Sequence, residues 1–191
     1  MSSPARILAF AGSLRAGSFN KMLLRTAVRA AEAEGASVTT IDLADYAMPI
    51  YDGDYEAEHG LPENAGKLKS VFMEHNGLLI ASPEYNSSIT AALKNTIDWV
   101  SRKDGAADLS CYAGKTAGLI ATGGGFGGLR GLVHVRQILG NISVLVIPEQ
   151  AAISGAWDAF DDNDELKDEG QRESVKKVGA ALARTLAKLH G

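Results

Sequence analysis

The hydrophobic residues of the chain recur with two kinds of spacing that follow one another from end to end. Residues 6–11 form a short apolar run typical of a buried strand, and the apolar positions between residues 23 and 31 then recur at helical spacing. The same succession predicts further strands at 37–42, 77–81, 115–122 and 143–147, and further helices at 63–75, 89–100, 129–139 and 175–189.

This succession of five strands and five helices predicts an α/β fold. We expect a single domain, residues 1–191, in which a parallel sheet has helices on both faces. Right-handed crossovers leave few strand orders, and the order 2-1-3-4-5 makes the first, third and fourth strands neighbours. The loops 12–20, 83–88 and 123–128 follow these strands and would therefore meet in one crevice at the carboxyl edge of the sheet.

The connections between these elements carry further signals. Residues 43–62 contain prolines, glycines and acidic side chains, which predict a loop with little regular structure; its length is typical of a binding or subunit-contact segment. Gly140 is expected to end the helix before it, and Pro148 to end the fifth strand. Residues 151–164 are predicted to be irregular.

The loop at residues 12–20 has the composition of a phosphate-binding site. It joins the first strand to the first helix, so the unpaired amides and the positive dipole end of that helix face it. Gly12 and Gly17 permit close approach of the backbone, and the loop adds one permanent charge and several short polar side chains, from Arg15, Ser13, Ser18 and Asn20. The alternative is an ordinary turn in which Ser18 caps the helix and Arg15 lies in solvent.

The two other loops favour a flat ring in the same crevice. Residues 123–128 supply backbone with little side-chain bulk. A fixed turn, backbone amides and an aromatic side chain come from Pro83, Glu84, Tyr85 and Asn86. Taken alone, either loop is equally well explained as a turn, and only their joint placement favours a ligand.

The glycines of the third loop also match a dinucleotide-binding fingerprint. Gly123, Gly125 and Gly128 lie between a strand and a helix, and Glu149 follows the next strand. A dinucleotide fold places this unit first, whereas here only one more strand and one helix follow it. A dinucleotide-dependent dehydrogenase is therefore the less favoured interpretation.

Composition and charge exclude several other classes of protein. The 191 residues are 46% hydrophobic, and no apolar run approaches the roughly 18 residues that cross a bilayer. A net charge of −4 with scattered basic residues argues against nucleic-acid binding. The lone Cys111 excludes an intrachain disulfide, and the histidines lack the spacing of a zinc site, so we predict no metal. Residues 1–4 show no export signal, which predicts a cytoplasmic protein without a membrane partner.

Four motifs stand in order along the chain. They are Gly12-Ser13-x-Arg15-x-x-Ser18-x-Asn20, Pro83-Glu84-Tyr85-Asn86-x-Ser88, Leu93-Lys94-Asn95-x-x-Asp98-Trp99 and Thr122-Gly123-Gly124. Together they resemble the NADPH-dependent FMN reductase family of flavodoxin-like proteins, which includes quinone, azo and chromate reductases of bacteria. The resemblance extends from the first strand to the fourth helix and implies a flavodoxin-like three-layer sandwich.

The resemblance also implies an FMN site and a hydride-transfer reaction. The FMN phosphate would be held by Ser13, Arg15, Ser18 and Asn20. The isoalloxazine ring would be lined by Pro83, Glu84, Tyr85, Asn86, Gly123 and Gly124. NADPH or NADH would be the co-substrate and a quinone, flavin or other small oxidant the acceptor, with no side chain acting as acid, base or nucleophile. A homodimer or homotetramer is implied, with residues 43–62 and 129–139 as candidate contacts.

The chain departs from the family pattern at Thr90 and Ala91, where the family usually has proline and glycine. We therefore expect the following helix to start slightly differently, which affects the nicotinamide side of the pocket. A second function remains open beside the reductase. It is a flavodoxin-type electron carrier, which passes single electrons to a protein partner without turning over NAD(P)H.

Overall fold

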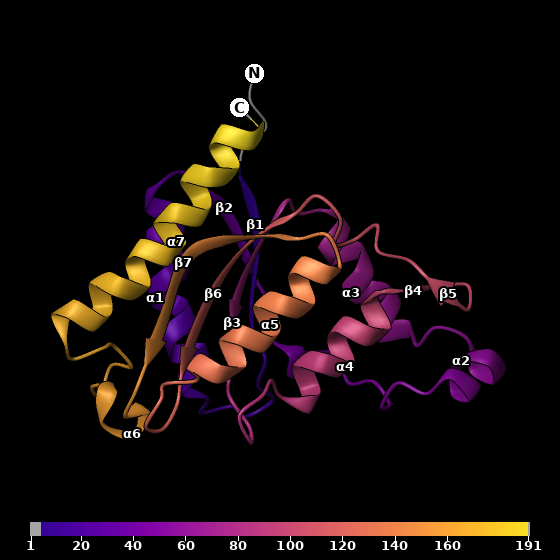
Figure 1. Cartoon of the computed structure of the whole chain (residues 1–191), viewed down its shortest axis with the longest axis horizontal. Helices are drawn as coiled ribbons and strands as arrows, with labels where there is room; N and C mark the ends of the chain where they lie inside the picture. Colours follow the sequence, from indigo (N-terminus) through magenta and orange to yellow (C-terminus); the bar gives the residue numbers. More distant parts are fainter. Residues whose placement is uncertain (1–4, 191) are drawn as a thin grey trace.

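The centre of the molecule is a parallel sheet of five strands. The computed structural model describes residues 5–190; residues 1–4, on which the absence of an export signal was argued, lie outside them, as does residue 191. The strand order is β2-β1-β3-β6-β7 (Figure 1), which confirms the predicted order 2-1-3-4-5. The strands are β1 (Arg6–Ala11), β2 (Ser37–Thr40), β3 (Gly77–Ala81), β6 (Thr116–Thr122) and β7 (Leu145–Ile153).

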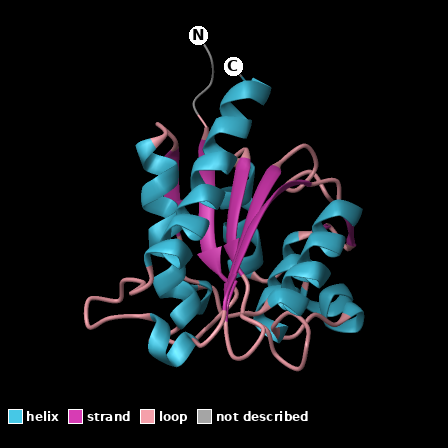
Figure 2. Cartoon of the chain, turned by 60° about the vertical axis from the view of Figure 1, so that its left-hand side comes forward, coloured by secondary structure: helices cyan, strands magenta, loops and turns pink. Residues whose placement is uncertain are grey.

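Helices cover both faces of this sheet and complete the predicted three-layer sandwich (Figure 2). One face carries α1 (Phe19–Ala33) and α7 (Glu169–His190). The other face carries α3 (Glu63–Met73), α4 (Ala91–Val100) and α5 (Leu129–Asn141). Along residues 5–190, none of the helices is both long and apolar enough to cross a membrane.

The three central strands, β1, β3 and β6, are buried on both sides, which explains why they occur in the sequence as nearly continuous apolar runs. In β1, Ile7 and Ala9 join the core against α1 and α7, whereas Leu8 and Phe10 join the core on the opposite face. Because the five strands are parallel, the loops that follow β1, β3 and β6 leave the sheet at one edge. This carboxyl edge is the lower end of the molecule in Figure 1.

The prediction of an irregular loop at residues 43–62 is wrong. This segment contains a 3₁₀ turn, η1 (Leu43–Asp45), and a helix, α2 (Gly53–His59). The carboxylates of Asp42 and Asp52 accept hydrogen bonds from the first amides of η1 and α2. These two caps are the local signal that the prolines and glycines of the segment obscured.

Tertiary hydrogen bonds hold residues 46–60, here called the α2 arm, against α4. The Pro49 carbonyl accepts from Asn95 Nδ2 at 2.9 Å and from Trp99 Nε1 at 2.7 Å. The Asn95 Oδ1 atom accepts from the Tyr51 amide at 2.8 Å. The third sequence motif therefore positions the arm, whose helix α2 lies beyond α4 at the right of Figure 1.

A buried ion pair fastens the far part of the arm. Glu56 of α2 lies 2.8 Å from Arg102, the first residue of a hairpin formed by β4 (Arg102–Lys103) and β5 (Ala106–Ala107). The Glu56 side chain is 3% exposed. Hydrogen bonds from the Arg102 guanidinium lower the pKa of Glu56, against the opposing effect of burial.

The predicted ends of the fifth strand and of the helix before it are also wrong. Pro148 lies inside β7, which continues into the segment 151–164 that was predicted to be irregular and that also contains α6 (Ala156–Ala159). β7 is an edge strand whose pairing with β6 shifts register around Pro148, so the missing N–H interrupts no regular ladder. Gly140 lies within α5, and the left-handed residue after the helix is Ser143, with φ of 68°.

Candidate cofactor site

The loop between β1 and α1 presents free hydrogen-bond donors at the carboxyl edge of the sheet. Within residues 5–190, the backbone N–H groups of Gly17, Phe19 and Asn20 donate to no acceptor. They lie at the N-terminus of α1, where the helix dipole is positive. This part of the chain therefore favours an anion.

Side chains of the same loop add to this set of donors. Ser13 and Ser18 are each 4% exposed, and Ser18 precedes α1 without a side-chain capping bond, so the ordinary-turn interpretation lacks its cap. Arg15 is exposed, and in the described part of the chain its guanidinium forms neither a salt bridge nor a hydrogen bond. A free guanidinium, two hydroxyl groups and unpaired amides match the acceptors of a phosphate monoester.

The side chain of Asn20 bonds to the end of β6. Its Nδ2 atom donates to the Thr122 carbonyl at 2.9 Å, and its Oδ1 atom accepts from the Thr122 amide at 3.1 Å. Both groups of the side chain are therefore used, and both partners are buried. Asn20 joins the start of α1 to the end of β6, a partnership across the sheet that no local pattern in the sequence reveals.

The second loop is a tight turn after β3. Tyr85 and Ser88 exchange backbone hydrogen bonds of 3.0 and 3.1 Å, and the two residues between them, Asn86 and Ser87, have φ of 51° and 65°. This is the pattern of a two-residue turn with left-handed central residues, in which asparagine is favoured. The turn leaves the Tyr85 side chain 53% exposed, while Pro83 before it is buried.

The carboxylate of Glu84 does not belong to the free donors and acceptors of the site. It accepts a hydrogen bond of 3.0 Å from the Gly131 amide in the first turn of α5, and it lies 3.9 Å from Arg130. An acidic group at a helix N-terminus is stabilised by the dipole. Glu84 therefore links the second loop to the helix that follows the third loop.

The third loop, residues 123–128, is tied to the end of β7. The carbonyls of Gly123 and Gly124 accept from the amides of Ala156 and Gly155. A Cβ at Gly124 would lie 3.7 Å from the Trp157 ring, so the indole lies against this glycine while remaining 74% exposed. No local pattern around Trp157 in the sequence predicts this contact.

Thr90 joins the first and second loops. Its hydroxyl donates to the Gly12 carbonyl at 2.6 Å and accepts from the Leu93 amide at 3.1 Å, so Thr90 is the N-cap of α4. A Cβ at Gly12 would lie 3.0 Å from Leu93, which shows how closely the loop approaches α4. The departure from the family pattern at Thr90 and Ala91 therefore gives a helix that starts at Ala91 and is bonded to the first loop.

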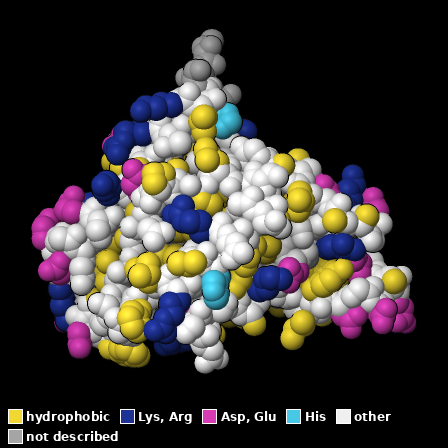
Figure 3. All heavy atoms as spheres, viewed as in Figure 1, with side chains coloured by type: hydrophobic (Ala, Val, Ile, Leu, Met, Phe, Trp, Pro, Cys, Tyr) yellow, Lys and Arg dark blue, Asp and Glu magenta, His cyan; other side chains and the backbone are white. Residues whose placement is uncertain are grey.

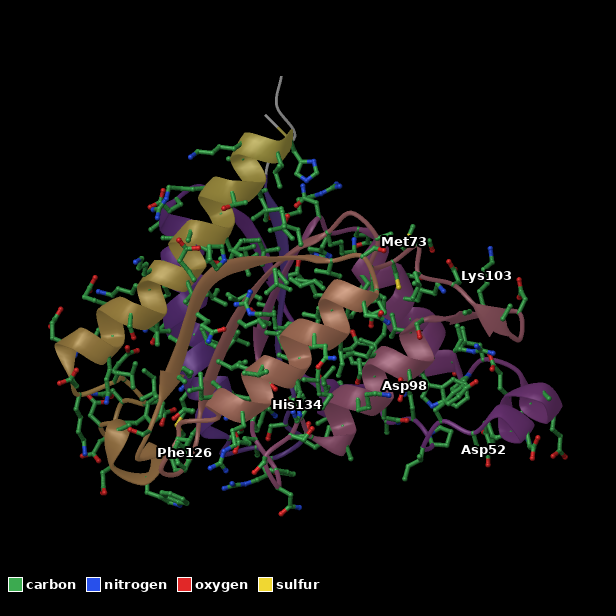
Figure 4. All side chains as sticks on the ribbon, in the orientation of Figure 1. Asp52, Met73, Asp98, Lys103, Phe126 and His134 are labelled. Carbon is green, nitrogen blue, oxygen red and sulfur yellow. The ribbon has the colours of Figure 1, made fainter. Side chains whose placement is uncertain are left out.

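A cavity of about 380 Å³, here called the cofactor cavity, lies between these loops. It is lined by Gly12, Ser13, Leu14, Arg15, Tyr85, Thr90, Ala91 and Ala92. The structure thus brings three predicted residues, Ser13, Arg15 and Tyr85, into one lining. The other predicted residues lie in the surrounding loops and do not line this cavity; they are Ser18, Asn20, Pro83, Glu84, Asn86, Gly123 and Gly124. Figure 4 places Phe126 of the third loop at the same lower edge, far from Met73 and Lys103.

The dinucleotide fingerprint does not form a binding unit. Glu149 lies within β7 rather than at its carboxyl end, where a ribose would be bound. Gly127, with φ of 61°, has the carbonyl carbon of Ile153 only 2.7 Å from the position of a Cβ, so glycine is needed there for packing on β7. Gly128, with φ of 87°, would likewise place a Cβ 2.7 Å from Ala121, so these two glycines have a structural explanation.

Outside the loops, the one cysteine is structural. Cys111 is buried, its thiol donates to the Val100 carbonyl at 3.3 Å, and burial raises its pKa to about 11. A thiol with that pKa is almost entirely protonated near neutral pH and is a poor nucleophile. Across residues 5–190, no group of three or more His, Cys, Asp and Glu side chains is arranged to hold a metal ion.

Comparison with known proteins gives a consistent set of relatives. The family model described as NADPH-dependent FMN reductase matches residues 5–158. An NADPH:quinone oxidoreductase of Arabidopsis thaliana is 34% identical over 191 residues, covering 97% of this chain and 94% of the relative. An NAD(P)H-dependent FMN reductase of Pseudomonas aeruginosa is 33% identical and covers 100% of both chains. A quinone reductase of Escherichia coli K12 is 36% identical, covering 81% of this chain and 80% of the relative.

Solved structures agree with the fold. The flavoenzyme NAD(P)H:(acceptor) oxidoreductase FerB of Paracoccus denitrificans superposes with a TM-score of 0.80 at 25% identity, covering 98% of this chain and 99% of its own. An archaeal flavodoxin superposes with a TM-score of 0.62 at 10% identity, covering 95% and 98%. The flavodoxin likeness shows the shared fold alone.

Proposed function

The chain belongs to the NADPH-dependent FMN reductase family, and from that premise we propose that it binds FMN at the carboxyl edge of the sheet and reduces a quinone, flavin or other small oxidant with NAD(P)H. The observation that carries the proposal is the meeting of Arg15 and Tyr85 in one cavity, beside the free amides of α1. A ligand that carries a phosphate and a flat ring needs a cationic side chain, such as Arg15, next to an aromatic one, such as Tyr85.

The residues present fit an FMN phosphate. Arg15 supplies an unpaired forked charge, Ser13 and Ser18 supply hydroxyl groups, and the start of α1 supplies amides. Asn20 belongs to this site as a positioning residue, because its amide is committed to Thr122 and holds the α1 amides in place.

The second and third loops supply the walls for the ring. Tyr85 offers an exposed aromatic side chain, and Gly123 and Gly124 offer backbone without bulk. The N–H groups of Glu84 and Asn86 donate to no acceptor in the described part of the chain and are available to a polar ring edge. Preorganised donors of this kind stabilise negative charge that develops on a bound ring.

Bound FMN supplies the redox chemistry, which is hydride transfer from NAD(P)H to the oxidant. For a quinone the balance is simple. The hydride carries two electrons and one proton, a second proton comes from water, and the products are NAD(P)⁺ and the hydroquinone. The protein binds and orients the reactants, and no side-chain acid, base or nucleophile is required.

Anaerobic mixing of the FMN-loaded protein with NADPH tests this proposal. The flavin absorbance should bleach within a turnover and return when a simple quinone is added. A yellow protein that NADPH does not bleach would instead be a flavodoxin-type carrier, and a protein that retains no flavin would contradict the FMN site itself. Repeating the mixing with NADH gives the nucleotide preference.

Assembly and location belong to the same proposal. We propose a homodimer or homotetramer that acts in the cytoplasm. Its support is the exposure of large apolar side chains on the two predicted contact segments, with Ile50 of the α2 arm 83% exposed and Val133 of α5 56% exposed. Figure 3 shows hydrophobic side chains interrupting the polar surface on the face that carries α5. Sedimentation of the purified protein measures the assembly, and cell fractionation the location.

A further inference from the structure

A second cavity adjoins the cofactor cavity. It measures about 320 Å³ and lies between η1, the start of the α2 arm and α4. Leu14 and Ala92 line both cavities, so the two spaces meet at these side chains. A ligand whose ring lies beside a cofactor in the first cavity is therefore next to the second one, here called the apolar groove.

The walls of this groove are apolar. They consist of Leu14, Leu43, Ala44, Tyr46, Ala47, Met48, Ala92, Asn95 and Thr96. The two polar residues of α4 in this set are already satisfied: Asn95 bonds to the backbone of the α2 arm, and the Thr96 hydroxyl donates to the Ala92 carbonyl. None of the lining residues carries a charge.

We propose that the apolar groove binds the hydrocarbon side chain of a quinone acceptor whose ring lies beside the cofactor held in the cofactor cavity. The inference rests on the proposed function, and it narrows the acceptor from any small oxidant to quinones with an aliphatic tail. Apolar walls without a charged group favour a hydrocarbon chain and disfavour the phosphates and ribose of NAD(P)H. A cavity of about 540 Å³ beside α1 contrasts with the groove, because charged side chains of both signs line it, among them Lys21, Arg25 and Asp42.

The groove is built before any ligand arrives. Asn95 and Trp99 hold the Pro49 carbonyl, and this fixes the chain just after Met48. Tyr46 and Met48 pack against the core cluster that includes Leu43. Because the apolar site is preformed, less conformational entropy is lost when a ligand binds.

The test compares two 1,4-benzoquinones that differ only in one substituent, methyl or n-hexyl. Steady-state turnover with NADPH should give a KM about tenfold lower for the hexyl quinone, with kcat unchanged, because several methylene groups leave water. Ala47→Phe fills the groove without touching the cofactor cavity and should abolish this difference, while leaving the methyl quinone unaffected. Ala57→Phe, an equal change at an exposed position of α2 outside the groove, should preserve the difference.

Calorimetric titration of the oxidised, FMN-loaded protein provides a readout without turnover. The hexyl quinone should bind with a more negative heat-capacity change than the methyl quinone, and Ala47→Phe should remove that excess. Equal KM values for the two quinones in the wild type would overturn the inference while leaving the proposed function intact. A tail preference that survives Ala47→Phe would overturn it too, as would a change of oligomeric mass in that variant alone, which would make the groove a contact with a second copy. A wild type inactive on both quinones would instead refute the proposed function.

Discussion

Arg15 lines the cofactor cavity, and its positive charge has no partner in the described part of the chain. Arg15→Ala should weaken FMN binding by about 1.5–3 kcal/mol, the loss expected for a charged hydrogen bond. Fluorescence titration of flavin-free protein with FMN measures this. The control is Arg25→Ala. It also removes a positive charge, but Arg25 lies on α1 and pairs with Asp164, so the affinity for FMN should be nearly unchanged. An unaltered Kd in Arg15→Ala would refute the phosphate assignment.

Asn20 should stabilise the folded protein even when FMN is absent. Asn20→Ala leaves the buried N–H and carbonyl of Thr122 without partners, at a cost of about 2–4 kcal/mol in the free energy of unfolding. Urea unfolding of the flavin-free protein measures the loss. The control is Asn64→Ala, which removes one exposed bond to the Ala47 carbonyl and should cost well under half as much. If the two variants unfold alike, Asn20 does not hold α1 to β6.

At this scale the sequence identified the residue types of the site but not their partners. Asn20 was expected on the phosphate, yet its amide bonds to Thr122 from 102 positions away. Glu84 is expected beside the ring, and its carboxylate bonds to Gly131 of α5, which leaves the backbone N–H as its free donor. A local motif states which groups are available. Only the folded sheet determines which of them its neighbours already use.

The packing of α1 on α7 depends on one glycine. A Cβ at Gly179 would collide with the carbonyl oxygen of Ala27, a backbone atom that cannot turn aside. Gly179→Ala should therefore lower the free energy of unfolding by about 2–3 kcal/mol, although alanine is the better helix former. Gly170→Ala in the first turn of α7, where only an exposed carboxylate is near, should be neutral or slightly stabilising. Thermal unfolding of the pair measures the difference, and equal melting temperatures would contradict this packing.

The α2 arm should become less stable in acid because of Glu56. Its pKa is lowered in the folded protein, so the pair with Arg102 contributes stability above the ordinary carboxylate pKa of about 4.3 and loses it as the pH falls below that value. Glu56→Gln should cost up to about 3 kcal/mol at neutral pH, because it leaves the guanidinium without its counter-charge. It should also flatten the decline in stability between neutral pH and about pH 3. Urea unfolding at several pH values follows both effects; an unchanged acid slope would contradict the role of Glu56.

At the scale of elements, the segments with regular hydrophobic spacing were predictable. The elements that were predicted wrongly depend on contacts between residues distant in sequence. The apolar runs of β1 and β3 fall where they were expected, because strands buried on both faces need continuous hydrophobicity. Pro148 failed as a stop because β7 lies at the edge of the sheet. The α2 arm was missed because its stability comes from Asn95, Trp99 and Arg102, which are distant in sequence.

The arrangement of the whole molecule was predictable from the order of its elements. Alternating strands and helices with right-handed crossovers leave few sheets, and the observed order β2-β1-β3-β6-β7 follows from them. The order places the loops after β1, β3 and β6 side by side, and bonds such as Thr90 to Gly12 then join them. At the proposed site, cofactor binding would thereby be linked to the stability of the fold.

That linkage gives a prediction for the molecule as a unit. Free FMN at about 100 times its Kd should add about 2.7 kcal/mol to the free energy of unfolding, because the proposed site exists only where three loops of the folded sheet meet. For a chain of 191 residues this corresponds to a rise of about 5–10 °C in Tm. Riboflavin at the same concentration lacks the phosphate that Arg15 and the α1 amides would hold, so it should raise Tm by much less. Equal shifts with the two flavins would mean that the loop between β1 and α1 does not bind the phosphate, and an absent shift with both would mean that the three loops form no flavin site.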